Sequence, residues 1–117
     1  MRFQNIFKQK CTEMDKKIAI TCYTELKNIE EISYRDLLYS VDSLIFNLTN
    51  IGMKCGMRII IIPEYNIDTY IYTIALACMG ITIVALDKDT PMQLLEKEIT
   101  ELKPAAIIAS KKVYDIK

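Results

Sequence analysis

The side chains that could do chemistry are few, and histidine is not among them. Because the 117-residue chain contains no histidine, histidine acid–base catalysis, histidine ligation of zinc and a Ser-His-Asp triad are all excluded for its own residues. Two carboxylates, Asp87 and Asp89, follow an apolar run and could form a paired-acid metal site. Acids in a loop before a proline more often form a turn and start a helix, so a turn is the favoured interpretation.

The four cysteines, at positions 11, 22, 55 and 78, are widely spaced and include no Cys-x-x-Cys pair. Since the first ten residues contain no continuous apolar core, a secretory leader is not expected. We therefore expect reduced, mostly buried thiols in a cytoplasmic protein. Cys55 lies between Lys54 and Gly56, where a cation could make the thiol reactive; ordinary packing or simple exposure is the more common outcome.

Phosphate-binding glycine loops are missing from the sequence. The apolar run at 58–62 is followed by Pro63-Glu64-Tyr65-Asn66 and not by Gly-x-Gly-x-x-Gly, no Gly-x-x-x-x-Gly-Lys-Ser/Thr occurs, and the chain has three glycines in all. Tyr65, Tyr70 and Tyr72 are expected to pack in an interface and not to stack on a ligand. The sequence thus offers no candidate catalytic, cofactor-binding or metal-binding residue.

Overall charge argues against two classes of partner. Fifteen basic residues balance fifteen acidic ones, so the chain lacks the positive field that attracts nucleic acid or an anionic membrane surface. Residues 69–86 form an uncharged apolar segment of the length of a short membrane span. Its helix-favouring first part ends at Gly80 and β-branched residues follow, which indicates a helix joined to a strand. We expect no nucleic-acid or membrane partner.

The first half of the chain predicts helix, hairpin and helix. Phe3, Ile6 and Phe7 have helical spacing, and the apolar runs 18–22 and 30–33 predict two strands joined by a polar turn. Ser33 begins a capping-box-like Ser-Tyr-Arg-Asp pattern, in which Asp36 favours the helix dipole. Apolar residues then recur at three- and four-residue spacing until Gly52, which predicts a long amphipathic helix.

The second half predicts alternating strands and helices. Residues 58–62 form a continuous apolar run, as expected for a strand buried on both faces by helices on either side. A helix over 66–79, a strand over 81–86, a helix over 91–102 with Thr90 as N-cap and Pro91 in the first turn, and a strand over 105–110 follow. The fold class is therefore α/β: a parallel β-α-β-α-β sheet flanked by helices, preceded by a β-hairpin and a long helix, in a single domain over 1–117.

Three segments resemble, in order and spacing, the opening of the adenylate-forming superfamily, most of all nonribosomal peptide synthetase adenylation domains. Ile32-Ser33-Tyr34-Arg35-Asp36-Leu37 is similar to the family's Leu-Thr/Ser-Tyr-x-Glu-Leu motif. The segment 51–59, Ile-Gly-Met-Lys-Cys-Gly-Met-Arg-Ile, is similar to Leu-Gly-Val-x-x-Gly-Asp-x-Val. The segment 77–87, Ala-Cys-Met-Gly-Ile-Thr-Ile-Val-Ala-Leu-Asp, is similar to Leu-Lys-Ala-Gly-x-x-Tyr-x-Pro-Leu-Asp. The resemblance runs from about Phe7 onward and includes the closing helix and strand.

Four positions depart from the family pattern: Met57, Cys78, Ile83 and Ala85 stand where the family has Asp, Lys, Tyr and Pro. The resemblance implies an ATP- and Mg-dependent parent reaction that converts a carboxylate to an acyl-adenylate and pyrophosphate. It also implies that the phosphate loop, the adenine- and ribose-binding segments and the catalytic lysine would lie beyond Lys117. The chain is then expected to bind no cofactor alone.

Three hypotheses follow. The chain is a fragment, split subunit or truncated relative of an AMP-forming ligase, not catalytic alone; or it is a non-catalytic docking module; or it is an unrelated α/β binding protein of similar topology. In the first two, an exposed apolar surface and an unpaired strand edge would favour self-association or a synthetase partner chain.

Overall fold

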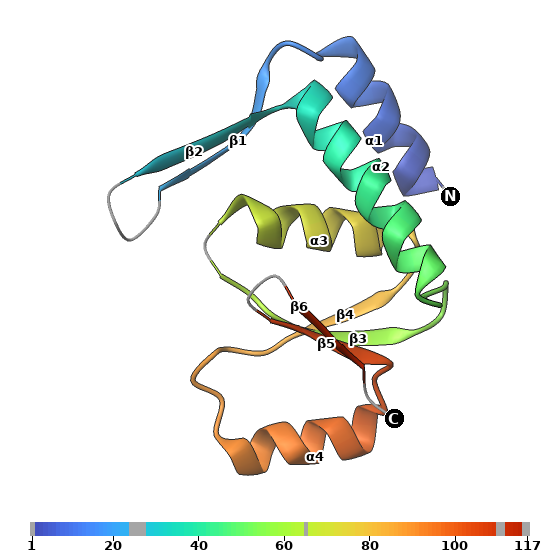
Figure 1. The fold of residues 1–117 in the computed structure, drawn as a ribbon, viewed down its shortest axis with the longest axis vertical. Coiled ribbons are helices and arrows are strands. Elements are labelled where there is room, and N and C mark those ends of the chain that lie inside the picture. Colours follow the sequence, from blue (N-terminus) through green and yellow to red (C-terminus); the bar gives the residue numbers. More distant parts are fainter. Residues whose placement is uncertain (1, 24–27, 65, 110–111, 116–117) are drawn as a thin grey trace.

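A computed structural model describes residues 2–23, 28–64, 66–109 and 112–115. The molecule is layered, with two helices and a hairpin above a third helix, a four-stranded sheet beneath it and a fourth helix below the sheet (Figure 1). The order of elements follows the sequence prediction closely, with one added strand at the end. The predicted fold class is confirmed.

The upper layer consists of α1 (Arg2–Glu13), the antiparallel hairpin of β1 (Ile18–Tyr23) and β2 (Ile29–Ser33), and α2 (Tyr34–Asn50). The predicted cap is present, because the backbone N–H of Asp36 donates to Ser33 Oγ at 3.1 Å. The backbone N–H groups of Tyr34 and Arg35 donate to the carbonyls of Lys17 and Asp15. These bonds fix the start of α2 against the segment that leads into the hairpin.

The main sheet has the strand order β4-β3-β5-β6. Its three parallel strands are β3 (Arg58–Ile62), β4 (Thr82–Ala85) and β5 (Ala106–Ala109), with β3 in the centre. The predicted last strand extended to Ser110, which lies outside the described residues. The antiparallel strand β6 (Lys112–Asp115) was not predicted, because four residues with only two apolar positions give too short an alternation to indicate a strand.

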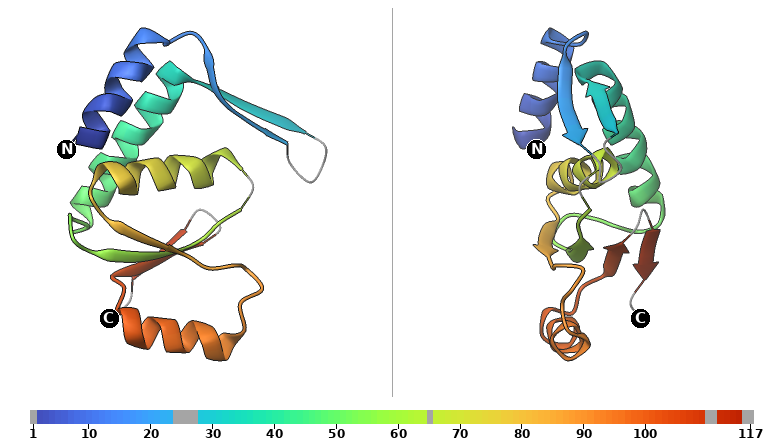
Figure 2. Two further views of the ribbon diagram at one scale, coloured as in Figure 1. Left: turned by 180° about the vertical axis from the view of Figure 1, so that it is seen from behind. Right: turned by 90° about the vertical axis from the view of Figure 1, so that its left-hand side faces the viewer.

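The two crossover helices lie on opposite faces of this sheet, as the two views in Figure 2 show from behind and from the side. Helix α3 (Ile67–Cys78) connects β3 to β4, and α4 (Met92–Leu102) connects β4 to β5. The predicted N-cap of α4 was wrong. Pro91 occupies the cap position without a side-chain bond, while the Thr90 hydroxyl instead donates to the carbonyl of Asp87.

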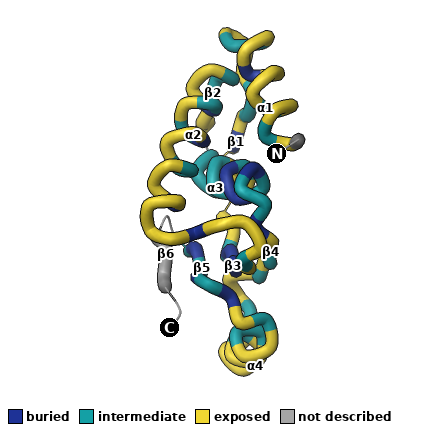
Figure 3. The backbone as a smooth tube through the Cα atoms, turned by 90° about the vertical axis from the view of Figure 1, so that its right-hand side faces the viewer, coloured by how far each residue is buried: buried dark blue, intermediate teal, exposed yellow. Residues whose placement is uncertain are grey.

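Two clusters of buried apolar residues hold the layers together, and the burial colours of Figure 3 place them around α3 and β3. The sheet cluster joins α2, α3, β3 and β5, and the helix cluster joins α2 to α3. The buried members of the sheet cluster are Leu48, Met53, Ile59, Ile61, Leu76, Ile81, Ala106 and Ile108. Those of the helix cluster are Leu37, Val41, Ala75 and Cys78. As predicted, β3 is covered on both faces: Ile59 and Ile60, which point to opposite sides, are both fully buried.

The uncharged segment 69–86 is divided between α3 and β4. In the described part of the chain, no helix has both the length and the apolar character needed to cross a bilayer. The helix-turn-strand interpretation of this segment is therefore confirmed.

Candidate functional site

The place where this topology would hold a ligand is the carboxyl end of the parallel sheet, between β3 and β5. From β3 the chain crosses through α3 to β4, on one side of β3, and then through α4 to β5, on the other side of β3. The direction of the crossovers therefore reverses between β3 and β5. Ligands in open α/β sheets bind at such a switch point. A small hollow lies at this position, lined by the ends of β3 and β5 and by the first turn of α3.

The polar groups of Glu64, Asn66 and Thr69 at this hollow form hydrogen bonds with one another. The backbone N–H of Thr69 donates to Asn66 Oδ1 at 2.9 Å, which caps α3. The backbone N–H of Glu64 donates to Thr69 Oγ1 at 3.0 Å, and Asn66 Nδ2 donates to Glu64 Oε2 at 3.1 Å. Burial, and to a lesser extent the charge of Asp68, raises the pKa of Tyr72, so this phenol is neutral near pH 7. The cap formed by Asn66 and Thr69 was not predicted, although Asn66-x-x-Thr69 after a buried strand is a capping signal.

This hollow does not fit a nucleotide. It leaves about 10 Å³ for the centre of a water molecule, which is roughly the space that one water needs. The parent reaction implied by the resemblance uses ATP and Mg, and the described residues at the switch point do not supply a cradle for either. No group of three or more acidic, cysteine or histidine side chains suited to a metal ion occurs among the described residues.

The structure separates the paired carboxylates from this hollow. Asp87 and Asp89 follow β4, where the backbone N–H of Asp89 donates to Asp87 Oδ1 at 3.1 Å. The Thr90 hydroxyl bonds the carbonyl of Asp87 in the same turn. This arrangement is the turn that the sequence favoured, and both contacts are local.

The thiols divide as expected. Cys11, Cys22 and Cys78 are buried and Cys55 is exposed, all four unpaired with one another. Burial raises the pKa of each buried thiol, and the charge of Asp42 adds to the effect at Cys11 and Cys78. The exposed Cys55 lies in the turn before β3, at the end of the sheet opposite to the hollow.

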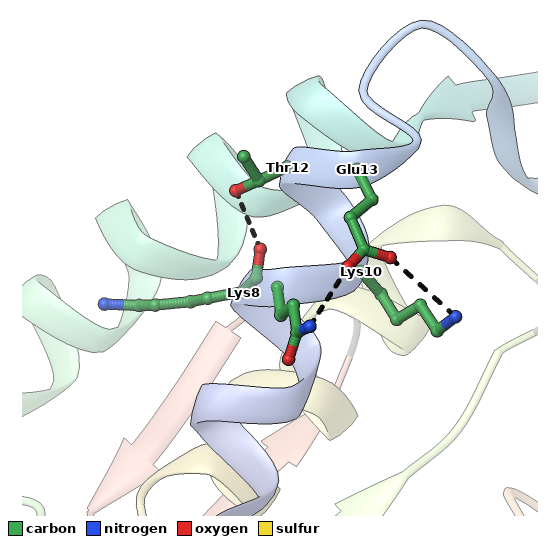
Figure 4. Close-up of polar contacts among 5 residues, drawn as sticks. Lys8, Lys10, Thr12 and Glu13 are labelled. Atoms are coloured by element: carbon green, nitrogen blue, oxygen red, sulfur yellow. Dashed lines mark hydrogen bonds and ion pairs between the residues drawn. The ribbon is translucent and has the colours of Figure 1, made fainter.

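The described tyrosines of α3 and the outer helices make packing and local polar contacts. Tyr72 packs against the sheet cluster, Tyr70 is 44% exposed, and Tyr65 lies outside the described residues. The polar side of α1 carries local contacts between successive turns (Figure 4): Gln9 Nε2 donates to Glu13 Oε1 at 3.0 Å, and Lys10 Nζ lies 4.0 Å from Glu13 Oε2. A wide, open depression on α2 is lined by Tyr39, Asp42, Ser43, Phe46 and Asn47.

In the structure, residues of the three motif segments cap a helix and form turns between helices and strands. Ser33 caps α2. Gly52 and Gly56, with φ of 100° and 89°, form the turn from α2 into β3, and the Gly56 N–H donates to the carbonyl of Gly80 at 3.2 Å. Gly80, with φ of 72°, ends α3 before β4. These positive φ values are those that glycine adopts without strain.

Comparisons with solved structures agree with this arrangement. No family model matches the sequence, and no curated protein does either. The crystal structure of CmiS6 matches 98% of the chain with a TM-score of 0.80 and 20% identity. The amino-terminal subdomain of NpsA from Klebsiella oxytoca matches 91% with a TM-score of 0.77 and 20% identity. This chain has the fold of part of an adenylation-domain amino-terminal subdomain.

A third match, an artificially fused NpsA–ThdA adenylation–PCP di-domain from Klebsiella oxytoca, covers 90% of this chain with a TM-score of 0.78 and 19% identity. The chain spans 28% of the CmiS6 structure, 26% of the NpsA subdomain and 20% of the di-domain. At these identities the likeness establishes the fold. The likeness does not assign the activities of those whole proteins to this chain.

Proposed function

We propose that this chain serves as part of the amino-terminal scaffold of an AMP-forming ligase and supplies no catalytic group. The parent reaction joins ATP and a carboxylate to give an acyl-adenylate and pyrophosphate. Two independent observations support the proposal: the order and spacing of the three motif segments, and the fold likeness over nearly the whole chain. The sheet, its two crossover helices and the capped α2 form the scaffold.

The placement of the glycines carries the non-catalytic part of the proposal. The chain has three glycines, and all three occupy turns that precede β3 or β4, at the amino-terminal end of these strands. A glycine-rich phosphate loop would lie at the carboxyl end, next to a helix N-terminus. Because none of the three glycines lies there, we expect the chain alone to lack a glycine loop whose backbone N–H donors could serve phosphoryl or adenylyl transfer. We therefore expect it to bind neither ATP nor Mg tightly by itself.

The decisive experiment is ATP–pyrophosphate exchange. The purified chain is assayed alone and together with the product of the neighbouring reading frame, with a panel of carboxylate and amino-acid substrates. We expect no exchange from the chain alone and exchange from the combination. Exchange that scales with the concentration of the chain alone contradicts the proposal.

Two substitutions test whether polar residues at the carboxyl end act only as scaffold. In the active combination, Glu64→Gln and Asp87→Asn are expected to change the exchange rate by less than about tenfold, the equivalent of 1.4 kcal/mol. Both variants are first checked for unchanged unfolding midpoints. A loss far larger than tenfold in a folded variant would assign that carboxylate a direct role and overturn the scaffold proposal.

A docking module is the second candidate function, and the depression on α2 favours it. Tyr39 and Phe46, which line it, are 75% and 66% exposed, and large exposed apolar groups often mark interaction surfaces. Such a module would bind a synthetase chain or a second copy without supporting exchange in any combination. An unrelated binding protein would do neither. We also propose a cytoplasmic location, because four cysteines without a disulfide are typical of a reducing compartment; fractionation of cells would test it.

A further inference from the structure

Strand β4 ends the main sheet with one edge unpaired by any described strand. The backbone N–H groups of Thr82 and Leu86 donate to the carbonyls of Met57 and Ile61. Because backbone groups alternate in direction along a strand, the N–H and C=O groups of Ile83 and Ala85 point away from β3. The free edge therefore presents two donors and two acceptors in a row.

This edge lacks the devices that normally prevent pairing between molecules. Natural edge strands carry charges, proline or a bulge, but residues 81–86 contain neither a charge nor proline, and β4 pairs with β3 in unbroken register. Thr82 and Ala85 are exposed. The end of the uncharged segment 69–86 thus forms an unpaired strand edge without charges.

The uncharged surface continues from β4 onto α3. One side of α3 packs on the sheet cluster and another on the helix cluster, and the helical repeat places Tyr70, Thr73 and Ala77 together on the remaining side. Figures 2 and 3 place α2 over the β5–β6 half of the sheet and α3 over the β3–β4 half. The side of α3 turned away from α2 therefore lies above the free edge of β4.

We propose that a second copy of this chain pairs with the free edge of β4, antiparallel and across a two-fold axis at Val84. In this register Ile83 of each copy exchanges both backbone hydrogen bonds with Ala85 of the other, so all four exposed donors and acceptors are paired. The two Val84 residues face each other as a non-hydrogen-bonded pair. The two four-stranded sheets become one eight-stranded sheet.

Charge is the reason to choose a second copy as the occupant. A surface without charges gives a charged partner nothing to recognise, whereas it meets its own copy without repulsion. The proposed register places Asp87 opposite Ile81 and Lys88 opposite Gly80, so no like charges are opposed. The chain has zero formal net charge, so two copies do not repel at long range. A closed two-fold arrangement also leaves no free β4 edge for further growth.

The register is tested by cysteine cross-linking in a Cys55→Ser background, which removes the exposed native thiol. In Val84→Cys the two introduced thiols face each other, at the roughly 4.5 Å Cα separation of such pairs, where a disulfide forms readily. Oxidised glutathione accepts the two electrons and leaves as two molecules of reduced glutathione. Thr82→Cys is the control, because its thiol is more exposed but lies about four residues from its copy.

We expect a covalent dimer from Val84→Cys and little from Thr82→Cys on non-reducing gels. Sedimentation equilibrium of the unmodified chain at micromolar concentration should show a monomer–dimer equilibrium. Ala85→Pro removes an outward N–H and should weaken the dimer by about tenfold or more. Thr82→Lys should weaken it as well, whereas Thr100→Lys, at an exposed position on α4, should not.

Any of three results with the chain alone overturns the inference: a monomer throughout the concentration range, equal cross-linking of the two cysteine variants, or a dimer unaffected by Ala85→Pro. Pairing of β4 only with the rest of a synthetase, in place of a second copy, also overturns it. The inference does not rest on the adenylation proposal, because absence of exchange activity leaves the dimer measurement unchanged and a monomer leaves the exchange assay unchanged.

Discussion

The two crossover helices cover opposite faces of one sheet, and they do so unequally. Helix α3 carries a single charged residue, Asp68, and buries Ala75, Leu76 and Cys78. Helix α4 carries four charged residues and buries none of its own. Yet Ile60, on the face of the sheet away from the sheet cluster, is as fully buried as Ile59.

This difference shows that a helix can cover a strand without burying its own side chains deeply. Helix α4 lies on the face of the sheet to which Ile60 belongs (Figure 1), and its apolar residues Leu95 and Ile99 are only half-buried, while most of the helix stays in solvent. Helix α3 lies between two clusters and holds the upper layer to the sheet. Stability is therefore expected to concentrate on the α3 side.

The largest effect is expected from Leu76→Ala. Leu76 is fully buried between α3 and the sheet, so truncation removes apolar contact and leaves a cavity that costs about 2–5 kcal/mol. The same truncation at Leu95, which is half-buried on α4, should cost less than about half as much. Urea unfolding followed by circular dichroism measures both.

Equal losses of unfolding free energy at Leu76 and Leu95 would contradict the difference between the two helices, because they would mean that α4 is anchored as firmly as α3. A change in the urea m-value would show that a variant had altered the compactness of one of the states. The two midpoints are therefore compared at constant m-value.

The sequence predicted the element order because its apolar spacing changes sharply between strand and helix. The run at 58–62 and the cap at Ser33 are examples in which local chemistry alone decides the structure. The unequal anchoring of α3 and α4 depends on which residues meet across the sheet, and that is set by the strand order. The same applies to the hollow near Asn66 and to the free edge of β4, since both arise only when distant segments are placed side by side.

Removal of a helix cap is expected to have an effect of intermediate size, and it should differ between α3 and α4. Ser33 and Asn66 accept backbone N–H bonds at the starts of α2 and α3, so Ser33→Ala and Asn66→Ala should each cost about 0.5–2 kcal/mol. Thr90→Ala precedes α4, whose cap residue Pro91 makes no side-chain bond, and should cost under about 0.5 kcal/mol. The same unfolding assay applies, and a Thr90 loss as large as that of Ser33 would show that the Asp87–Thr90 turn serves α4 as a cap.

The smallest effect is expected from pH, and it should come from the α3 side of the sheet. Burial, with Asp42 as the second cause, raises the pKa of Cys11 and Cys78 above the ordinary thiol value of 9.0. The folded chain therefore keeps these protons at pH values where the unfolded chain loses them. The resulting stability is fully present below about pH 9.0 and is lost as pH rises through the folded pKa.

The unfolding free energy should thus fall with pH in the alkaline range, as measured by urea titrations at a series of pH values. Cys78→Ala should make that slope shallower even though it lowers stability overall, because one of the groups that links protonation to folding is gone. Asp42→Asn should also reduce the slope, because it removes the second cause of the raised thiol pKa values. An unchanged slope in Cys78→Ala would mean that the alkaline loss arises elsewhere; among the described residues, Cys11, Cys22 and Tyr72 are the other groups whose pKa the fold raises.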